Sequence, residues 1–211
     1  MQLQKFGFTT PATLLSAAAT SFASVSPALF LAPPASAQTS DTYEANSWRR
    51  FSSPKGGFRV LMPGTPTESI ESIKLGNGTV DLHLFSLELE DGKVGYALVY
   101  ADFPNISNQL SLRRTNHILD SAIEGTVGEG KLLTEQAATL YGYYGKKFKY
   151  RDSNGLIGKG RYYWVKQRLY GLLAVARAEA DLSQGADKFL NSFQLPQEMD
   201  TGASIAPVQV E

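Results

Sequence analysis

Hydrophobic and polar residues alternate along much of the middle of this chain, and this two-residue period predicts β-strands with one buried face. The run 93–101 is almost wholly apolar, which is typical of a strand that is buried on both faces. Turn-forming residues lie between the runs, most clearly from Gly76 to Gly78 and from Asp152 to Gly155. The other expected strands are 48–52, 58–62, 68–75, 79–89, 131–140, 144–152, 156–166 and 169–177.

Two other segments have the period of an amphipathic helix, at about 108–124 and 182–194. The residues expected to face inward are Leu112, Thr115, Leu119 and Ala122 in the first helix, and Ala186, Phe189, Leu190 and Phe193 in the second. Strands, a helix, more strands and a last helix predict the α+β class. We expect an antiparallel β-sheet packed between helices, with one helix after about five strands and another at the C-terminal end.

The first 37 residues differ in composition from the rest of the chain. They hold one charged residue, Lys5, and an apolar run from Thr13 to Leu31 that serine, threonine and proline interrupt. Ala35 and Ala37 provide the small side chains that signal peptidase requires, so we expect a signal peptide, 1–37, that is cleaved after Ala37. The alternative is a retained anchor, but a spanning helix needs about 20 consecutive apolar residues.

The remaining residues divide into three parts. We expect a flexible leader at 38–46, a single domain at 47–195, and a disordered tail at 196–211, which lacks hydrophobic periodicity. Cleavage would leave no transmembrane span. The chain contains no cysteine, so the domain has to be stabilised by its core without disulfides.

The charge of the chain argues against nucleic acid as a partner. The full chain has 20 basic and 20 acidic residues, and removing Lys5 with the signal peptide leaves 19 against 20, a net charge of −1. A nucleic-acid-binding domain usually has a strong basic field.

Catalytic and metal-binding residue types are sparse. The two histidines, His83 and His117, have no local motif of a metal site or a catalytic triad, and we interpret both as surface histidines. The acidic cluster of Glu88, Glu90 and Asp91 falls at a hairpin tip. Its carboxylates would be solvated there, so none of them is expected to be buried as acid–base catalysis requires. We therefore expect no enzymatic activity and no cofactor.

Glycines between Gly155 and Gly160 superficially suggest a phosphate-binding loop. Such a loop needs a strand before it and a helix after it, whereas strands are expected on both sides here. We interpret the segment as a hairpin whose glycines let another segment approach closely.

Basic residues are concentrated in the hairpin that spans 144–166. Because side chains alternate along a strand, the first strand presents three cations on one face and the second strand presents two. If the register aligns these faces, the cations form one patch that could dock an acidic protein surface or anionic lipid. The alternative is an ordinary solvated sheet face. The candidate partner-binding residues are Lys147, Lys149, Arg151, Lys159 and Arg161.

Several segments together resemble a group of exported cyanobacterial proteins with a PsbP-like domain. These segments are Phe51 to Pro66, Gly142 to Phe148, Arg168 to Leu172 and Phe189 to Phe193, and the likeness covers about Trp48 to Leu195. The resemblance implies the α/β/α sandwich of PsbP, a lumenal photosystem II subunit, whose fold nuclear Ran-binding relatives share. It also implies an assembly or binding role, in the periplasm or the thylakoid lumen.

These observations leave three candidate functions. The first is a non-enzymatic accessory or assembly protein that binds a protein partner at a photosynthetic or other membrane complex. The second is a small-ligand carrier with an apolar pocket between sheet and helix. The third is an unrecognised hydrolase, which would place His83 or His117 in a cleft beside a serine or carboxylates.

Overall fold

The computed structural model describes residues 48–75, 78–89, 93–107 and 110–195. The expected signal peptide (1–37), leader (38–46) and tail (196–211) lie outside the described residues, as do parts of the turns at 76–77 and 90–92. No helix in the described ranges combines the length and the apolar character that crossing a membrane requires.

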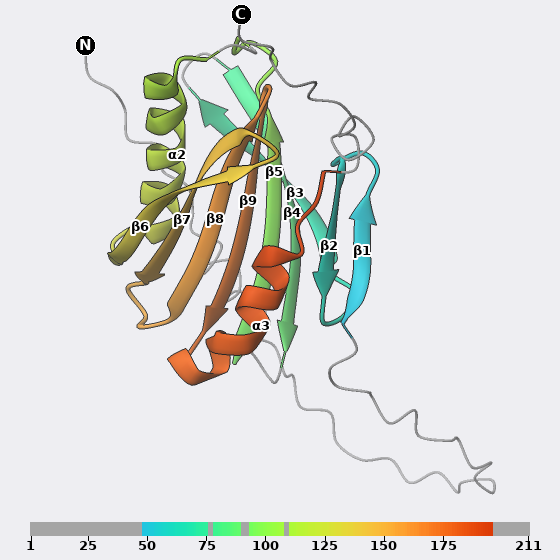
Figure 1. Cartoon of the computed structure of the whole chain (residues 1–211), viewed down its shortest axis with the longest axis vertical. Helices are drawn as coiled ribbons and strands as arrows, with labels where there is room; N and C mark the ends of the chain where they lie inside the picture. The colour runs from blue at the N-terminus through green and yellow to red at the C-terminus, as the bar shows by residue number, and fades with distance from the viewer. Residues whose placement is uncertain (1–47, 76–77, 90–92, 108–109, 196–211) are drawn as a thin grey trace, which may run out of the picture.

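Seven strands form one antiparallel sheet in the order β3-β4-β5-β9-β8-β7-β6, and β1 pairs with β2 in a separate hairpin (Figure 1). The hairpin strands are β1 (Arg49–Ser53) and β2 (Phe58–Met62). The sheet strands are β3 (Thr67–Leu75), β4 (Gly78–Leu89), β5 (Val94–Asp102), β6 (Lys131–Leu140), β7 (Tyr143–Arg151), β8 (Ile157–Val165) and β9 (Arg168–Ala176). The α+β class with an antiparallel sheet, expected from the sequence, is confirmed.

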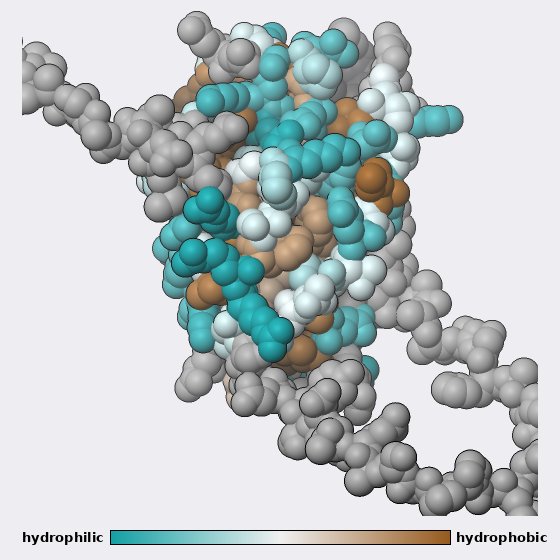
Figure 2. Space-filling model, turned by 90° about the vertical axis from the view of Figure 1, so that its right-hand side faces the viewer, coloured by the Kyte–Doolittle hydropathy of each residue, from teal (hydrophilic) through white to brown (hydrophobic). Residues whose placement is uncertain are grey.

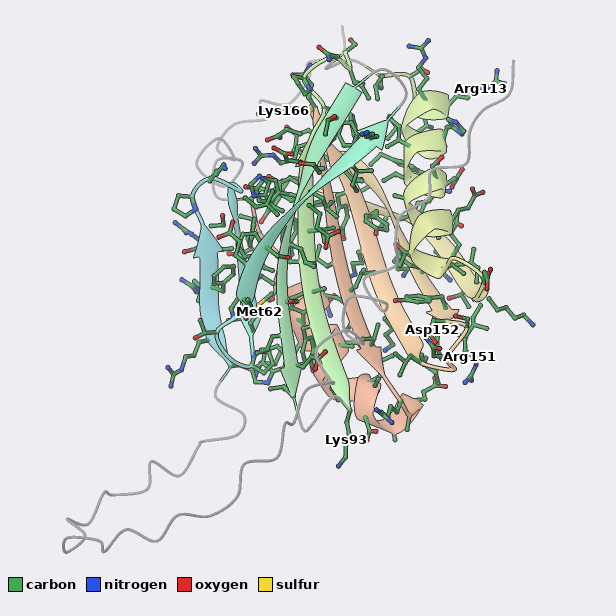
Figure 3. All side chains as sticks on the ribbon, turned by 180° about the vertical axis from the view of Figure 1, so that it is seen from behind. Met62, Lys93, Arg113, Arg151, Asp152 and Lys166 are labelled. Atoms are coloured by element: carbon green, nitrogen blue, oxygen red, sulfur yellow. The ribbon has the colours of Figure 1, made fainter. Side chains whose placement is uncertain are left out.

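Helix α2 (Leu112–Val127) covers one side of the sheet, which we call the back face (Figures 1 and 3). It begins at Ser111, whose hydroxyl accepts a hydrogen bond from the Arg114 amide, and so starts later than the expected 108. Its buried stripe includes Thr115, Leu119 and Ala122, as the periodicity predicted, but the prediction for Leu112 is wrong: this side chain lies in the first turn of the helix and is exposed.

The back face has its own core beneath α2. Leu119 packs there with Phe148 of β7 and Trp164 of β8. The hydroxyl groups of Thr126 and Tyr162 are hydrogen-bonded at 2.6 Å, which joins the last turn of α2 to β8. Burial raises the pKa of Tyr162 to about 12, so its hydroxyl stays protonated at physiological pH.

Helix α3 (Glu179–Asn191) and the β1–β2 hairpin cover the opposite side, the front face. Phe189 and Leu182 of α3 are fully buried, and the aromatic rings of Phe58, Phe85 and Phe193 continue this core under the hairpin. After α3 the chain pairs with β2, because Gln194 and Arg59 exchange backbone hydrogen bonds of 2.9 Å. That pairing fixes the end of α3 near Asn191, three residues earlier than expected.

The surface on the side of the β1–β2 hairpin is mainly polar. Figure 2 views this side and shows hydrophilic residues around a smaller central area of apolar ones. Large apolar side chains that are exposed elsewhere include Ile70 of β3, Leu112 of α2, and Leu132 and Leu133 of β6. They are scattered singly or in pairs, which is normal for a protein surface.

Candidate functional site

The register of β7 and β8 brings the five predicted cations onto one face. Lys147 lies opposite Arg161, and Lys149 lies opposite Lys159. Arg151 follows on the same side of β7, opposite Ile157. All five side chains belong to the front face, the side on which α3 packs.

Three of these cations bind α3. The ammonium group of Lys149 pairs with Glu179, and that of Lys159 pairs with Asp187 at 3.1 Å. The Arg161 guanidinium donates to the Leu190 carbonyl at 3.2 Å and to the side chain of Asn191. These contacts tie the whole length of α3 to β7 and β8, so much of the basic character of this hairpin stabilises the packing of a helix.

Helix α3 packs mainly on β9, β8, β5 and β2, so the front side chains at 131–136 of β6 and 147–151 of β7 are exposed, except for the half-buried Lys149. Figure 1 shows α3 in front of the middle of the sheet and beside these edge strands. We call this surface the open face; its residues are Lys131, Thr134, Gln136, Lys147, Lys149 and Arg151.

The open face is basic. Among the described residues, Lys131 and Lys147 form no ion pair with a carboxylate, and Arg151 donates to the Gly155 carbonyl of its own turn at 3.3 Å. The acid of β6, Glu135, lies opposite Phe148 and therefore points to the back face. Lys149 is the one cation here that a carboxylate of α3 binds.

On the reverse side of β7, the buried Lys146 makes ion pairs of a different kind with two partly exposed acids. It binds Asp120 of α2 and Glu135 of β6 together. Burial by itself lowers the pKa of the Lys146 ammonium, but the hydrogen bonds to both carboxylates outweigh burial and raise that pKa overall. Lys146 therefore joins α2 to the sheet edge and leaves the open face without a competing acid.

The structure corrects the interpretation of one histidine. His117 is exposed on α2, as expected, but the side chain of His83 is buried. Its ring stacks on Tyr100 with centroids 4.4 Å apart, and its Nδ1 lies 3.7 Å from Glu68. The sequence suggested a solvated residue because its neighbours Leu82 and Leu84 face the other way; the front face, however, is covered as well.

Neither histidine belongs to a metal cluster in the described ranges, where no three His, Cys, Asp or Glu side chains gather closely enough to hold an ion. Of the acidic cluster, Glu88 is exposed, and Glu90 and Asp91 lie outside the described residues.

The glycines after Gly155 do permit close packing: a Cβ on Gly158 would lie 2.1 Å from the ring of Tyr150, and one on Gly160 would lie 2.3 Å from that of Phe148.

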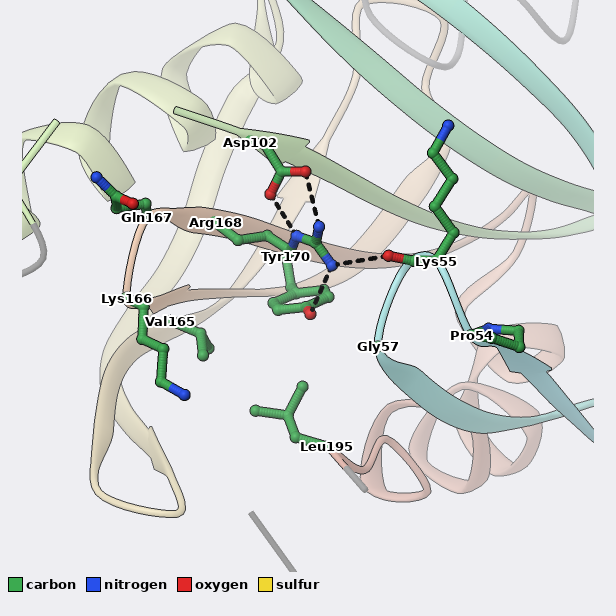
Figure 4. A pocket seen from close by; sticks show the side chains of 10 residues that line it. All are labelled: Pro54, Lys55, Gly57, Asp102, Val165, Lys166, Gln167, Arg168, Tyr170 and Leu195. Atoms are coloured by element: carbon green, nitrogen blue, oxygen red, sulfur yellow. Dashed lines mark hydrogen bonds and ion pairs between the residues drawn. The ribbon is translucent and has the colours of Figure 1, made fainter. Parts of the chain in front are cut away.

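Sequence reasoning missed a polar cluster at the end of the sheet, centred on Arg168 (Figure 4). Its guanidinium binds both oxygens of Asp102, at 2.5 and 2.7 Å, and donates to the Gly56 carbonyl at 2.7 Å. It also lies 4.7 Å from the centre of the Tyr100 ring. Hydrogen bonds to Asp102 raise the pKa of Arg168 above its ordinary value. The sequence does not reveal this cluster, because its residues are far apart in the chain and meet only where the tertiary fold brings the β1–β2 turn to β9.

Comparison with solved structures found 15 chains that are similar to this one, and two of them are described below. No protein-family model and no curated protein matches the chain. The domain is similar to the solution structure of cyanobacterial PsbP (CyanoP) from Synechocystis sp. PCC 6803, with 15% identity, a TM-score of 0.47, and coverage of 75% of this chain and 97% of that one. It is also similar to a Pseudomonas aeruginosa protein of unknown function, PA94, described as a putative regulator, with 12% identity, a TM-score of 0.36, and coverage of 67% and 99%.

Proposed function

We propose that this chain is a non-enzymatic exported accessory protein that binds an acidic protein partner through the open face. We place the interaction outside the cytoplasm, in the periplasm or thylakoid lumen, at a photosynthetic or other membrane complex. The N-terminal composition and the family resemblance of the sequence support this location. The predicted set of five cations is thereby divided: Lys147 and Arg151 contact the partner, Lys159 and Arg161 hold α3, and Lys149 lies between the two groups because it pairs with Glu179.

One observation supports the proposal most directly. The open face is a part of the sheet that no helix covers, it has four cations, and the neighbouring acids are already paired with lysines. Glu135 is held by Lys146 on the back face, and Glu179 is held by Lys149. The remaining positive charge of Lys131, Lys147 and Arg151 would attract an acidic surface, speed its approach and orient it. A β-sheet is also a rigid platform, so little conformational entropy is lost when it docks.

The position of the open face at the sheet edge suits a protein partner. Strand β6 pairs with β7 on one side and forms the edge of the sheet with its other side. Its register shifts between Leu132 and Thr134, and such a bulge interrupts a regular edge. Uncontrolled pairing with another strand is thus disfavoured, and the exposed lysines discourage it further. Binding through side-chain charge is the mode that remains favoured.

The direct test is charge reversal at the two exposed cations of β7. In the variant Lys147→Glu/Arg151→Glu, α3 keeps its own ion pairs, so folding should be preserved. The matched control is Arg113→Glu/Arg114→Glu, which makes the same change of charge on the exposed surface of α2. Each full chain would be used to capture partners from membranes of the source organism, with identification by mass spectrometry and affinity measurement at low and high salt.

We expect the β7 variant to lose its specific partner, with affinity reduced at least about tenfold, and the α2 variant to retain it. Binding by the unaltered chain should weaken as salt rises, because the contacts are between surface charges. Equal capture by the β7 variant and the unaltered chain would refute the open face as the docking surface. Capture of an abundant lipid without protein would refute the protein partner.

A further inference from the structure

The two edges of the sheet differ in how they are protected. Strand β6, at one edge, pairs irregularly with β7, because the register shifts between Leu132 and Thr134. Strand β3, at the other edge, pairs with β4 without interruption from Thr67 to Leu75. Within the described part of the chain, no strand lies on the outer side of β3. A regular strand with an open side can accept another strand through its backbone amides and carbonyls.

Strand β3 is accessible as well as regular. Of residues 67–74, only Glu71 and Ile73 are half-buried, and the others are exposed. Ile70 is 54% exposed near the middle of the strand. In Figure 3, which shows the molecule from behind, the β3–β4 hairpin crosses diagonally on the near side. A single exposed isoleucine is ordinary on a protein surface, but this one lies at the centre of an edge that another strand could extend.

The sequence of β3 allows it to pair with a second copy of itself. In an antiparallel pair, residues directly opposite each other lie on the same face of the sheet. A two-fold axis between two copies of β3 therefore passes beside one residue rather than between two. Near the middle of the strand, the axis can lie at Ile70, Glu71 or Ser72, and each choice brings different side chains together.

The register centred on Ile70 is the most favourable of the three. It places the two copies of Ile70 directly opposite each other, and it places Glu71 opposite Ser69 of the partner subunit. Lys74 lies diagonally across from Glu68 of the partner subunit, at a separation that long side chains can span. This register therefore combines an apolar centre with opposite charges on either side of it.

The other two registers are less favourable. Centring on Glu71 sets two carboxylates directly opposite each other, which is destabilising. Centring on Ser72 sets Ile70 opposite Lys74 of the partner subunit, so that the isoleucine gains no apolar contact. Pro66 also suits the Ile70 register, because it directly precedes β3, lacks the amide hydrogen that a ladder needs, and falls where that ladder ends.

We propose that this chain forms a symmetric dimer in which the β3 strands of two copies pair antiparallel about Ile70, so that one sheet continues through both copies. The interface lies at the edge opposite to β6 and β7, and it leaves both open faces free. It goes beyond the proposed partner binding and does not depend on it. Two paired strands bury less than the standard interface of about 1,200–2,000 Å², so we expect a weak dimer with a Kd of about 10–100 µM.

Sedimentation velocity of the full chain between about 1 µM and about 1 mM measures the association. The variant Ile70→Lys sets two ammonium groups opposite each other and removes the apolar pair. Leu132→Lys is the matched control, since it makes the same change at an exposed side chain of the β6 edge. We expect Ile70→Lys to weaken the dimer at least about tenfold and Leu132→Lys to leave it unchanged, while both variants keep the melting temperature of the unaltered chain.

Disulfide cross-linking measures the register, and the chain has no cysteine of its own to interfere. The variants Ile70→Cys, Glu71→Cys and Ser72→Cys are each oxidised, and the covalent dimer is followed on a non-reducing gel. In the proposed register only the Ile70→Cys sulfurs lie opposite each other, at a Cα separation of about 4.5–5.5 Å that a disulfide can span. We expect Ile70→Cys to form covalent dimer at least about tenfold faster than the other two variants.

Three results would overturn the proposal. A chain that stays monomeric up to about 1 mM would exclude the dimer. Association that Leu132→Lys abolishes and Ile70→Lys retains would belong to the β6 edge. Equal rates for the three cysteine variants, or a faster rate for Glu71→Cys or Ser72→Cys, would exclude the Ile70 register. Partner capture by the open face is measured separately and survives each of these outcomes, because Ile70 lies at the other edge of the sheet.

Discussion

The two halves of the front face carry the same kind of side chain and use it differently. Under α3, Lys159 and Arg161 of β8 bind Asp187 and Asn191 of the helix. Beside α3, Lys147 of β7 has no such partner among the described residues and faces solvent. Basic residues that share one face of a sheet can therefore have two separate roles. Some of them bind a helix that packs on that face, and the others stay exposed and can bind a partner.

The division follows the path of α3. The helix runs along β8 and β9, and its acids lie where they can reach across to the nearer cations. Lys149 marks the border, because it belongs to the open face and still pairs with Glu179. The position of the last helix thus decides which lysines stabilise the fold and which can recognise a partner.

The largest expected effect comes from detaching α3. Phe189 is fully buried against Tyr96, with ring centroids 5.4 Å apart. Phe189→Ala should lower the free energy of unfolding by about 3–5 kcal/mol, through lost burial and a cavity. Urea denaturation followed by tryptophan fluorescence measures this. A loss below about 1 kcal/mol would contradict the view that burial by α3, rather than its ion pairs, holds the front face together.

The part-buried ion pairs of Lys146 on the back face rank second. Lys146→Met leaves Asp120 and Glu135 facing each other without a cation, and should cost about 1–3 kcal/mol at pH 7. The pKa of Lys146 is raised in the folded protein, so its contribution is complete below the unfolded value of about 10.4 and is lost as pH rises through the folded value.

Denaturation of both chains between pH 7 and pH 12 tests this dependence. The difference in unfolding free energy between the unaltered chain and Lys146→Met should shrink above about pH 10.4. A constant difference across that range would mean that the ammonium charge of Lys146 is not what the variant removes.

A smaller effect separates the two halves of the front face directly. Lys159→Met breaks the pair with Asp187 and should lower the free energy of unfolding by about 0.2–1 kcal/mol. Lys147→Met should change the free energy of unfolding by no more than about 0.5 kcal/mol. Parallel urea denaturation in low salt and in 1 M salt measures both, and salt should reduce the cost of Lys159→Met. If Lys147→Met proved the costlier of the two, Lys147 would have an intramolecular role.

The smallest expected effect lies at the border between the halves. The hydrogen bond from Lys149 holds the pKa of Glu179 below its usual value, so this pair stabilises the fold above the unfolded pKa of Glu179 and is lost as pH falls through the folded one. Lys149→Gln should raise the pKa of Glu179 toward its ordinary value, because Lys149 is the largest cause of the lowering. Carboxyl carbon NMR between pH 2 and pH 7 reads that pKa; no change would show that the pair does not persist in solution.

The strand pattern of the domain could be predicted because the strands have local signals, either alternating polar and apolar residues or runs of strand-forming residues, with turn residues between them. The expected run 131–140 is β6 itself, and Asp152 to Gly155 forms the turn between β7 and β8. The open face was partly visible for the same reason, since Lys147, Lys149 and Arg151 had to share a side. The Arg168 cluster was invisible, because Gly56 and Arg168 are 112 positions apart and meet through the fold.

The sequence by itself determined where strands and helices form, which side chains share a face of each strand, and that cysteine chemistry is excluded, because all of these depend on local period and composition. The tertiary structure alone decided that both faces of the sheet are covered, which buries His83, and that α3 occupies one part of a basic face and leaves the other part open. Coverage depends on how distant segments pack, and no local pattern contains that information.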